Sequence, residues 1–245
     1  MSALLEVEGL TKRFSGVTAV KDVSFALAAG EITGVLGPNG AGKTTLFNLL
    51  TGFLPSDHGA ARFEGRSVLG AAPHTIVNLG IARTFQLCRP FHGMTVRENV
   101  VVGCLAPRAN VGAGLEQRVS DILEEVGLAH KAAQPVDILP YGDLRRLEIG
   151  RALATRPKLL LLDEPFAGLG AGEIEPLVQL IHRLHDTQGL TILIIEHKLR
   201  EFMQLVSRVI AMDFGEIIAI GEPADIVRHP LVIESYIGKA DHGLA

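Results

Sequence analysis

The stretch that decides the fold reads Gly37-Pro-Asn-Gly-Ala-Gly-Lys-Thr44. An apolar run of strand length, residues 31–36, precedes it, and an amphipathic run of helix length, residues 45–51, follows it. A glycine-rich loop between a strand and a helix is the context that a phosphate-binding loop requires. Glycines let the backbone turn successive N–H groups inward, and the positive end of the helix attracts anions. The sequence therefore predicts a site for a nucleoside triphosphate.

Two side chains of this loop have specific expected roles. Lys43 would reach the β- and γ-phosphates, and the Thr44 hydroxyl would be a ligand of Mg²⁺. At ordinary amino-acid frequencies this pattern arises by chance in roughly one chain of this length in a hundred, and the flanking strand and helix make an accident rarer. The nucleotide-binding residues expected here are Gly37, Pro38, Asn39, Gly40, Ala41, Gly42, Lys43, Thr44 and Thr45.

Composition limits the class of protein. The 245 residues are 47% apolar, enough for one large α/β domain, and the net charge of −4 lacks the basic surplus of a general nucleic-acid binder. Cys88 and Cys104 form neither a metal-binding nor a disulfide framework, so a reducing compartment is expected. The chain shows no signal-peptide pattern, and no apolar run approaches the ~18 residues of a membrane-spanning helix. We expect a soluble chain whose membrane role comes through a partner.

Strand-length and helix-length patterns alternate along the chain, which predicts a mostly parallel sheet with helices on both faces. Strands are expected at residues 4–10, 20–27, 60–68, 158–163 and 190–195 and in a hairpin of residues 208–212 and 217–221. Helices are expected at residues 115–126, 144–153, 173–187 and 199–206 and from about residue 225. The helix at 144–153 would carry Arg145, Arg146 and Arg151 on its polar side. Residues 71–119 are rich in Gly, Pro and Arg and often break the periodicity.

Two carboxylates, Asp163 and Glu164, end a buried apolar strand. A carboxylate there is costly unless a cation satisfies it, so Asp163 fits a partner of Mg²⁺, usually through water. Glu164 would orient and polarise the attacking water beyond the γ-phosphate. The alternative is an acidic pair solvated at the strand end, which the glycine loop in the same chain disfavours.

Three other residues become candidates for the site because of their order along the chain relative to these motifs. Gln86 ends the run Arg83-Thr-Phe-Gln86, and His197 follows the strand that ends at Ile195. Each alone is more often an ordinary polar group. Phe14 is ordinarily core or strand surface, yet an aromatic at this distance before the loop can stack on adenine.

This order of features resembles the ATP-binding subunits of ABC transporters over essentially the whole chain. In the family's order stand Phe14, the phosphate loop, Gln86, the signature Leu139-Pro-Tyr-Gly-Asp143, the carboxylate strand and His197. Within the family, the chain is most similar to the branched-chain amino acid importer ATPases. The segments that carry this likeness are residues 83–86, 91–99, 141–148, 212–223 and 233–238.

The resemblance implies a P-loop NTPase of α/β class. It has a RecA-like, mostly parallel sheet core, an N-terminal antiparallel β subdomain and an inserted α-helical subdomain. Residues 1–245 would form a single nucleotide-binding domain. The approximate subdomains are residues 1–85 and 151–245 for the nucleotide-binding core with its β subdomain, and residues 86–150 for the helical signature subdomain.

The resemblance also implies a head-to-tail dimer that closes over two ATP molecules with Mg²⁺. Each site would join the phosphate loop of one subunit to Tyr141, Gly142 and Asp143 of the other. The residues expected to act in catalysis are Glu164, His197, which bonds the γ-phosphate, and Gln86, which senses it. The expected metal ligands are Thr44, Gln86 and Asp163.

The implied partners are transmembrane permease subunits, a second copy or a sister ATPase, and indirectly an external substrate-binding protein. No nucleic acid is expected. The chain would lie in the cytoplasm, peripherally on the inner face of the plasma membrane. The alternatives are a lipopolysaccharide-export ATPase, a soluble ABC protein of DNA repair or translation, a GTPase and a nucleotide-binding scaffold.

The sequence departs from the family pattern at three positions. Pro140 replaces the signature serine, which would supply a hydroxyl to the γ-phosphate, so a slow ATPase is expected. Gly170 stands where the family has Asp or Asn, which puts communication between the two sites in doubt. Asp143 stands at a position that is often Gly or Gln, and suits a helix start. Phe91 and Met94 belong either to a small subdomain core or to a groove for a permease helix.

Overall fold

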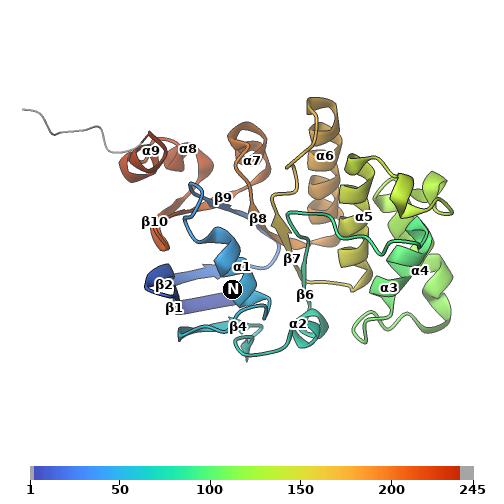
Figure 1. Ribbon diagram of the computed structural model, residues 1–245, viewed down its shortest axis with the longest axis horizontal. Coiled ribbons are helices and arrows are strands. Elements are labelled where there is room, and N and C mark those ends of the chain that lie inside the picture. Colours follow the sequence, from blue (N-terminus) through green and yellow to red (C-terminus); the bar gives the residue numbers. More distant parts are fainter. Residues whose placement is uncertain (1–2, 238–245) are drawn as a thin grey trace, which may run out of the picture. The chain divides into compact units, whose positions relative to one another are not determined.

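The computed structural model describes residues 3–237. The described residues divide into two compact units, residues 3–72 with 193–237, and residues 73–192. Figure 1 labels helices and strands of both. These units do not follow the subdomain boundaries expected at residues 85 and 151, so those boundaries stay a proposal. Among the described residues, no helix is long and apolar enough to cross a membrane.

The first unit contains a four-stranded sheet of order β2-β1-β4-β5. Its strands are β1 (Leu5–Phe14), β2 (Val17–Leu27), β4 (His58–Phe63) and β5 (Arg66–Ser67), with antiparallel pairing throughout. The single strand expected at residues 60–68 was therefore wrong. Glu64 and Gly65 both have positive φ, 49° and 76°, and turn the chain back on itself.

The first unit also holds β3 (Ile32–Leu36), most of β8 (Thr191–Ile195), β9 (Arg208–Asp213) and β10 (Glu216–Gly221), in the order β10-β9-β3-β8. β3 and β9 run parallel, while β9 and β10 form the expected antiparallel hairpin. Its helices are α1 (Lys43–Leu50), α7 (Leu199–Leu205), α8 (Pro223–Ile226) and α9 (Pro230–Ile237). The Phe202 ring packs so closely on Gly34 that a Cβ there would lie 2.1 Å from it, which fixes α7 against β3.

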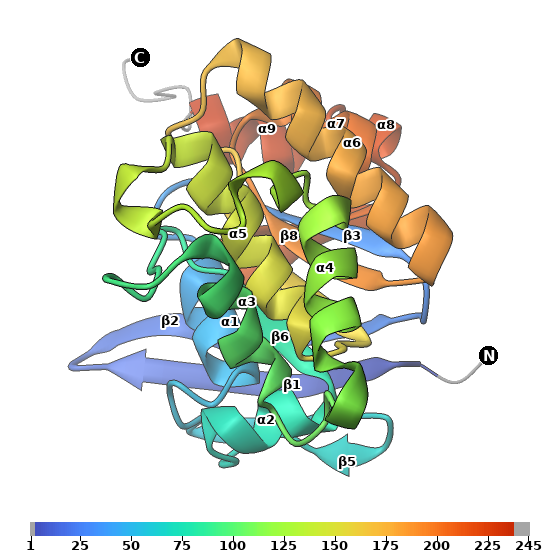
Figure 2. The same cartoon turned by 90° about the vertical axis from the view of Figure 1, so that its right-hand side faces the viewer.

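The second unit contains the parallel strands β6 (Ile81–Arg83) and β7 (Leu159–Asp163). Its α-helices are α2 (Pro73–Leu79), α3 (Val96–Cys104), α4 (Leu115–Glu125), α5 (Tyr141–Ala154) and α6 (Ala171–Gln188). Short 3₁₀ turns lie at Gly112–Gly114, Ala129–Lys131 and Val136–Ile138. Figure 2 shows α3, α4 and α5 side by side, and these three helices contact one another.

Candidate nucleotide site

The glycine loop lies in the first unit, between β3 and α1, as predicted. Gly42 has φ 98°, and a Cβ on it would lie 2.2 Å from the Ala19 carbonyl oxygen. A Cβ on Gly37 would lie 2.3 Å from the Met212 carbonyl oxygen. Gly42 is also the N-cap of α1 and gives it no side-chain cap. The close approach of β2 and β9 thus requires glycine, and the start of α1 is open to an anion.

Lys43 is buried, and its ammonium group already has partners in the loop. Its Nζ donates hydrogen bonds to the carbonyl oxygens of Gly37, at 2.7 Å, and Pro38, at 2.9 Å. Thr44 is exposed in the first turn of α1, and Thr45 is half-buried beside it. The positive charge is therefore held at the loop, where a phosphate oxygen can replace a carbonyl oxygen as acceptor.

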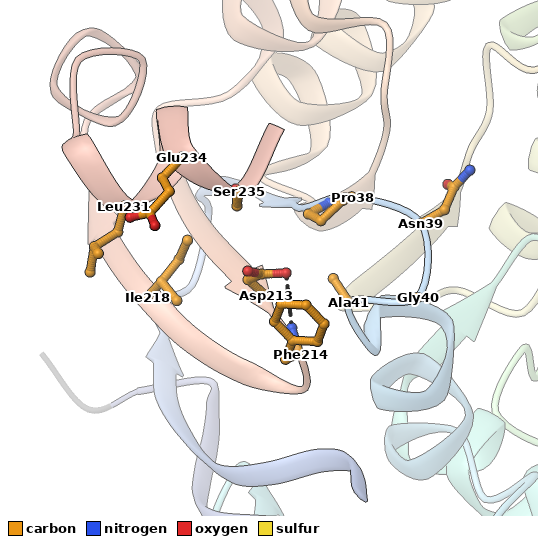
Figure 3. A pocket seen from close by; sticks show the side chains of 10 residues that line it. All are labelled: Pro38, Asn39, Gly40, Ala41, Asp213, Phe214, Ile218, Leu231, Glu234 and Ser235. Atoms are coloured by element: carbon orange, nitrogen blue, oxygen red, sulfur yellow. Dashed lines mark hydrogen bonds between the residues drawn. The ribbon is translucent and has the colours of Figure 1, made fainter. Parts of the chain in front are cut away.

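A cavity of about 730 Å³ lies beside the loop (Figure 3). The loop lines it with Pro38, Asn39, Gly40 and Ala41; the hairpin and α9 add Asp213, Phe214, Ile218, Leu231, Glu234 and Ser235. The Asp213 and Glu234 carboxylates would repel a triphosphate, and none of these ten residues is a lysine or arginine. The start of α1 at residues 42–45, which do not line this cavity, is therefore the better candidate for the phosphates.

Phe14 and His197 are both accessible in the first unit. The Phe14 ring, at the end of β1, is exposed and lies 5.5 Å from the Lys12 ammonium nitrogen, measured to the ring centroid. The imidazole of His197 is half-exposed, while its backbone N–H donates to the fully buried Glu196 Oε2 at 2.8 Å. Burial of Glu196 thus fixes the backbone after β8 and leaves the imidazole accessible to a ligand.

In the second unit, Asp163 ends β7 with its side chain only 3% exposed. Arg83 Nη2 donates to its Oδ2 at 2.6 Å, while Oδ1 is buried without a hydrogen-bond partner in the described part of the chain. Burial raises the pKa of the Asp163 carboxyl, and the Arg83 guanidinium opposes that rise. A buried acceptor without a donor is what a cation or its bound water would satisfy, so this residue fits Mg²⁺.

Residues 3–237 contain no group of three or more His, Cys, Asp or Glu side chains that could hold a metal ion. Mg²⁺ bound together with a nucleotide does not need one, because it takes one or two carboxylates and completes its shell with phosphate oxygens and water.

Gln86 and Glu164 are brought together although 78 positions separate them. Gln86 Nε2 donates to Glu164 Oε2 at 2.8 Å. Glu164 itself has φ 49°, a strained value for a residue with a Cβ, so the surrounding structure must hold it. The structure thus joins two of the three residues expected to act in catalysis in one polar contact.

The last three signature residues, 141–143, lie inside a helix and not ahead of it. α5 begins at Tyr141, three residues earlier than expected, and Pro140 is its N-cap. Gly142 faces Glu173, whose Oε1 would lie 2.5 Å from an added Cβ, and Asp143 forms an ion pair with Lys131. Tyr141, Gly142 and Asp143 therefore form the first turn, where a helix attracts anions.

The expectation that Arg145 lies on a polar face was wrong. Its side chain is only 2% exposed, because its guanidinium donates to carbonyl oxygens of Phe85 and Gln86 and of the loop after Glu164. Arg83, Arg145 and Glu148 are the site-forming residues that the sequence reasoning missed. The available signal was Arg145 followed three residues later by Glu148, a spacing that places opposite charges on one helix face.

Comparisons with known proteins agree over nearly the whole chain. A sequence model of the family described as "ABC transporter" matches residues 20–167. The high-affinity branched-chain amino acid transport ATP-binding protein LivG of Salmonella typhimurium is 41% identical, over 97% of this chain and 98% of that protein. The protein BraF of Pseudomonas aeruginosa, described in the same words, is 39% identical with the same coverage.

Solved structures give the same result for the fold. MJ1267, an ATP-binding cassette of an ABC transporter, matches with a TM-score of 0.88 and 33% identity, over 97% of this chain and all of that chain. The post-hydrolysis dimer of the cassette MJ0796, bound to ADP and Pi, has a TM-score of 0.79 at 23% identity over 89% of this chain and 98% of that one, and supports the fold alone. The predicted fold class is confirmed.

Proposed function

Since the chain belongs to the ABC transporter family, we propose that it is the ATP-binding and ATP-hydrolysing subunit of an importer of branched-chain or related amino acids. One observation carries this proposal. End-to-end identity of about 40% links the chain to two proteins described as high-affinity branched-chain amino acid transport ATP-binding proteins.

The side chains support hydrolysis in the following roles. The N–H groups at the start of α1 and the Lys43 ammonium bind the phosphates. Thr44, Gln86 and Asp163 are the proposed ligands that would hold Mg²⁺, which would neutralise phosphate charge when bound. Glu164 polarises the attacking water, and its contact with Gln86 orients that carboxylate. Phe14 stacks on adenine, and His197 bonds the γ-phosphate.

The proposed assembly is a head-to-tail dimer of this chain with itself or a sister ATPase, bound to permease subunits at the cytoplasmic face of the inner membrane. In the dimer, Tyr141, Gly142 and Asp143 of one subunit meet the nucleotide of the other. A cavity of about 200 Å³ in the second unit, lined in part by Phe85, Phe91 and Arg151, is the proposed seat of a permease helix.

Capture from native membranes tests this function. A tagged Glu164→Gln chain should hold ATP without hydrolysing it, so its assembly persists during purification. We expect two multispanning permeases to be captured with it in the presence of ATP. Lys43→Ala, which removes the phosphate-binding ammonium, is the matched control and should recover fewer partners. Lipopolysaccharide-export components would redirect the proposal to an exporter, and soluble or ribosomal partners alone would refute transport.

The proposed binding of a permease helix at this cavity has its own test. Phe91 lies under the Arg151 guanidinium, 4.3 Å from it to the ring centroid, and its ring is partly exposed. Phe91→Asp should abolish recovery of the permeases and leave ATP affinity unchanged. Unchanged permease recovery would instead assign Phe91 to the small core of this subdomain.

A further inference from the structure

Two side chains of α5, Arg145 and Glu148, hold the backbone of the loop that carries Gln86. Arg145 Nη1 donates to the Phe85 carbonyl oxygen at 2.8 Å, and Nη2 donates to the Gln86 carbonyl oxygen. Glu148 Oε1 accepts a hydrogen bond from the Phe85 backbone N–H at 3.0 Å. The N–H and C=O groups of Phe85 are therefore both bonded to the same helix, one turn past its signature residues.

The same guanidinium also reaches the loop after Glu164. Arg145 Nη2 lies 3.4 Å from the carbonyl oxygen of Ala167, and the Ala167 backbone N–H closes a turn onto the Glu164 carbonyl oxygen at 3.1 Å. One side chain thus contacts the two loops whose side chains meet in the Gln86–Glu164 hydrogen bond of 2.8 Å.

Burial makes this arrangement rigid. Arg145 is 2% exposed and stacks over the Tyr141 ring at 5.1 Å, and Glu148 lies 3.5 Å from its Nη1. A guanidinium presents its donors in a fixed planar fork, so it can bond several carbonyl oxygens at set angles, which the single ammonium of lysine cannot reproduce. A movement of α5 is therefore passed to both loops through bonds of fixed direction.

We propose that Arg145 is a positioning residue, which aligns Gln86 with Glu164 and links that alignment to the first turn of α5. The inference rests on the proposed ATPase function and deepens it. Arg145 acts through the two loops: it sets the orientation of the Glu164 carboxylate toward water and leaves nucleotide affinity to the phosphate loop. Substitution should therefore lower kcat and spare ATP affinity.

The experiment compares four full-length chains: wild type, Arg145→Met, Arg145→Lys and Arg146→Met. Arg146 is the matched control, because it lies on the same helix and donates to the Val126 carbonyl oxygen, away from both loops. We expect kcat to fall at least about tenfold in Arg145→Met and less in Arg145→Lys. ATP affinity, measured by equilibrium binding, should change less than about twofold, and Arg146→Met should retain wild-type kcat.

A double-mutant cycle with Gln86→Ala separates positioning from general destabilisation. If Arg145 acts through Gln86, the combined loss in kcat is smaller than the product of the single losses. Multiplicative losses, parallel loss of ATP affinity, or unchanged kcat in a folded Arg145 variant would overturn the inference. Thermal unfolding midpoints show whether each variant is folded. If Arg145→Met does not fold, Arg145→Lys replaces it in the experiment. Absence of turnover in the wild type would instead contradict the proposed function, and the inference with it.

Discussion

Pro140 stands at the signature position where the family has serine, and here it is the N-cap residue of α5 and gives the helix no side-chain hydrogen bond. Serine would add a hydroxyl for the γ-phosphate, and a hydrogen bond to a charged group contributes about 1.5–3 kcal/mol. We expect Pro140→Ser to raise ATP turnover of the assembled transporter by about ten- to a hundredfold. Pro140→Ala, which adds no hydroxyl, is the control and should stay near the wild-type rate. An unchanged rate in Pro140→Ser would remove proline as the cause of slow hydrolysis.

Cys88 is a second residue with a measurable consequence. Burial, with the Glu148 charge nearby, raises the pKa of its thiol from 9.0 to about 11. At pH 8 its reactive thiolate is then about a hundredfold scarcer than that of an ordinary cysteine. In a Cys104→Ser chain, alkylation of Cys88 should be slower than that of free cysteine by about this factor, until unfolding restores the ordinary rate. Equal rates in the folded chain would contradict the shift.

The same shift has a defined effect on stability. Because the folded thiol has the higher pKa, its contribution is fully present below about pH 9 and is lost as pH rises through about 11. In urea unfolding, a Cys88→Ser chain should therefore not show this part of the fall in the free energy of unfolding at alkaline pH.

The residues that could be predicted from the sequence were those whose partners lie near them in the sequence. Gly37, Gly42 and Lys43 could be picked out from their spacing alone, because all three lie in one short loop between β3 and α1. Arg145 could not be placed in this way, since its partners are backbone carbonyl oxygens that come from two other loops.

At the scale of elements, long periodic segments were predicted correctly, and the elements that were missed are short. α4 and α6 bury regular apolar faces, whereas α2, α9 and the three-residue β6 are too short to show a period. α3 was missed although Thr95 and Glu98 form a capping box, a signal readable from Thr-x-x-Glu. Thr95→Ala should lower the free energy of unfolding by about 0.5–2 kcal/mol, measured in urea. A Thr95→Ser control should retain most of it.

Two alanine substitutions in the phosphate loop test why the loop requires glycine. Gly42 and Gly40 both have positive φ, so an added Cβ strains either by about 1–2 kcal/mol. Only at Gly42 would that Cβ also overlap the backbone of Ala19, while space around Gly40 is open. Without nucleotide, Gly42→Ala should therefore lower the thermal midpoint more than Gly40→Ala does. Equal losses would mean that strain alone, and not the approach of β2, demands glycine there.

At the scale of the whole molecule, the proposed dimer makes oligomeric state depend on nucleotide. Glu164→Gln should shift from monomer to dimer by light scattering when ATP is added, because bound ATP joins the two subunits and is not consumed. ADP should not produce the shift, and a Glu164→Gln/Lys43→Ala chain should stay monomeric in ATP. A dimer of equal strength without nucleotide would contradict assembly through the ATP sites.

The two hydrogen bonds between Lys43 and its own loop have a consequence for selectivity. Any anion that recruits this ammonium must compete with two carbonyl acceptors that already hold it, so binding at the loop requires more than one weak contact. A single inorganic phosphate or sulfate ion offers few compensating contacts, whereas a nucleotide brings a chain of phosphates and a base to the same surface. The abundant small anions of a cell should therefore compete poorly for the loop, and its occupancy should follow the nucleotide pool.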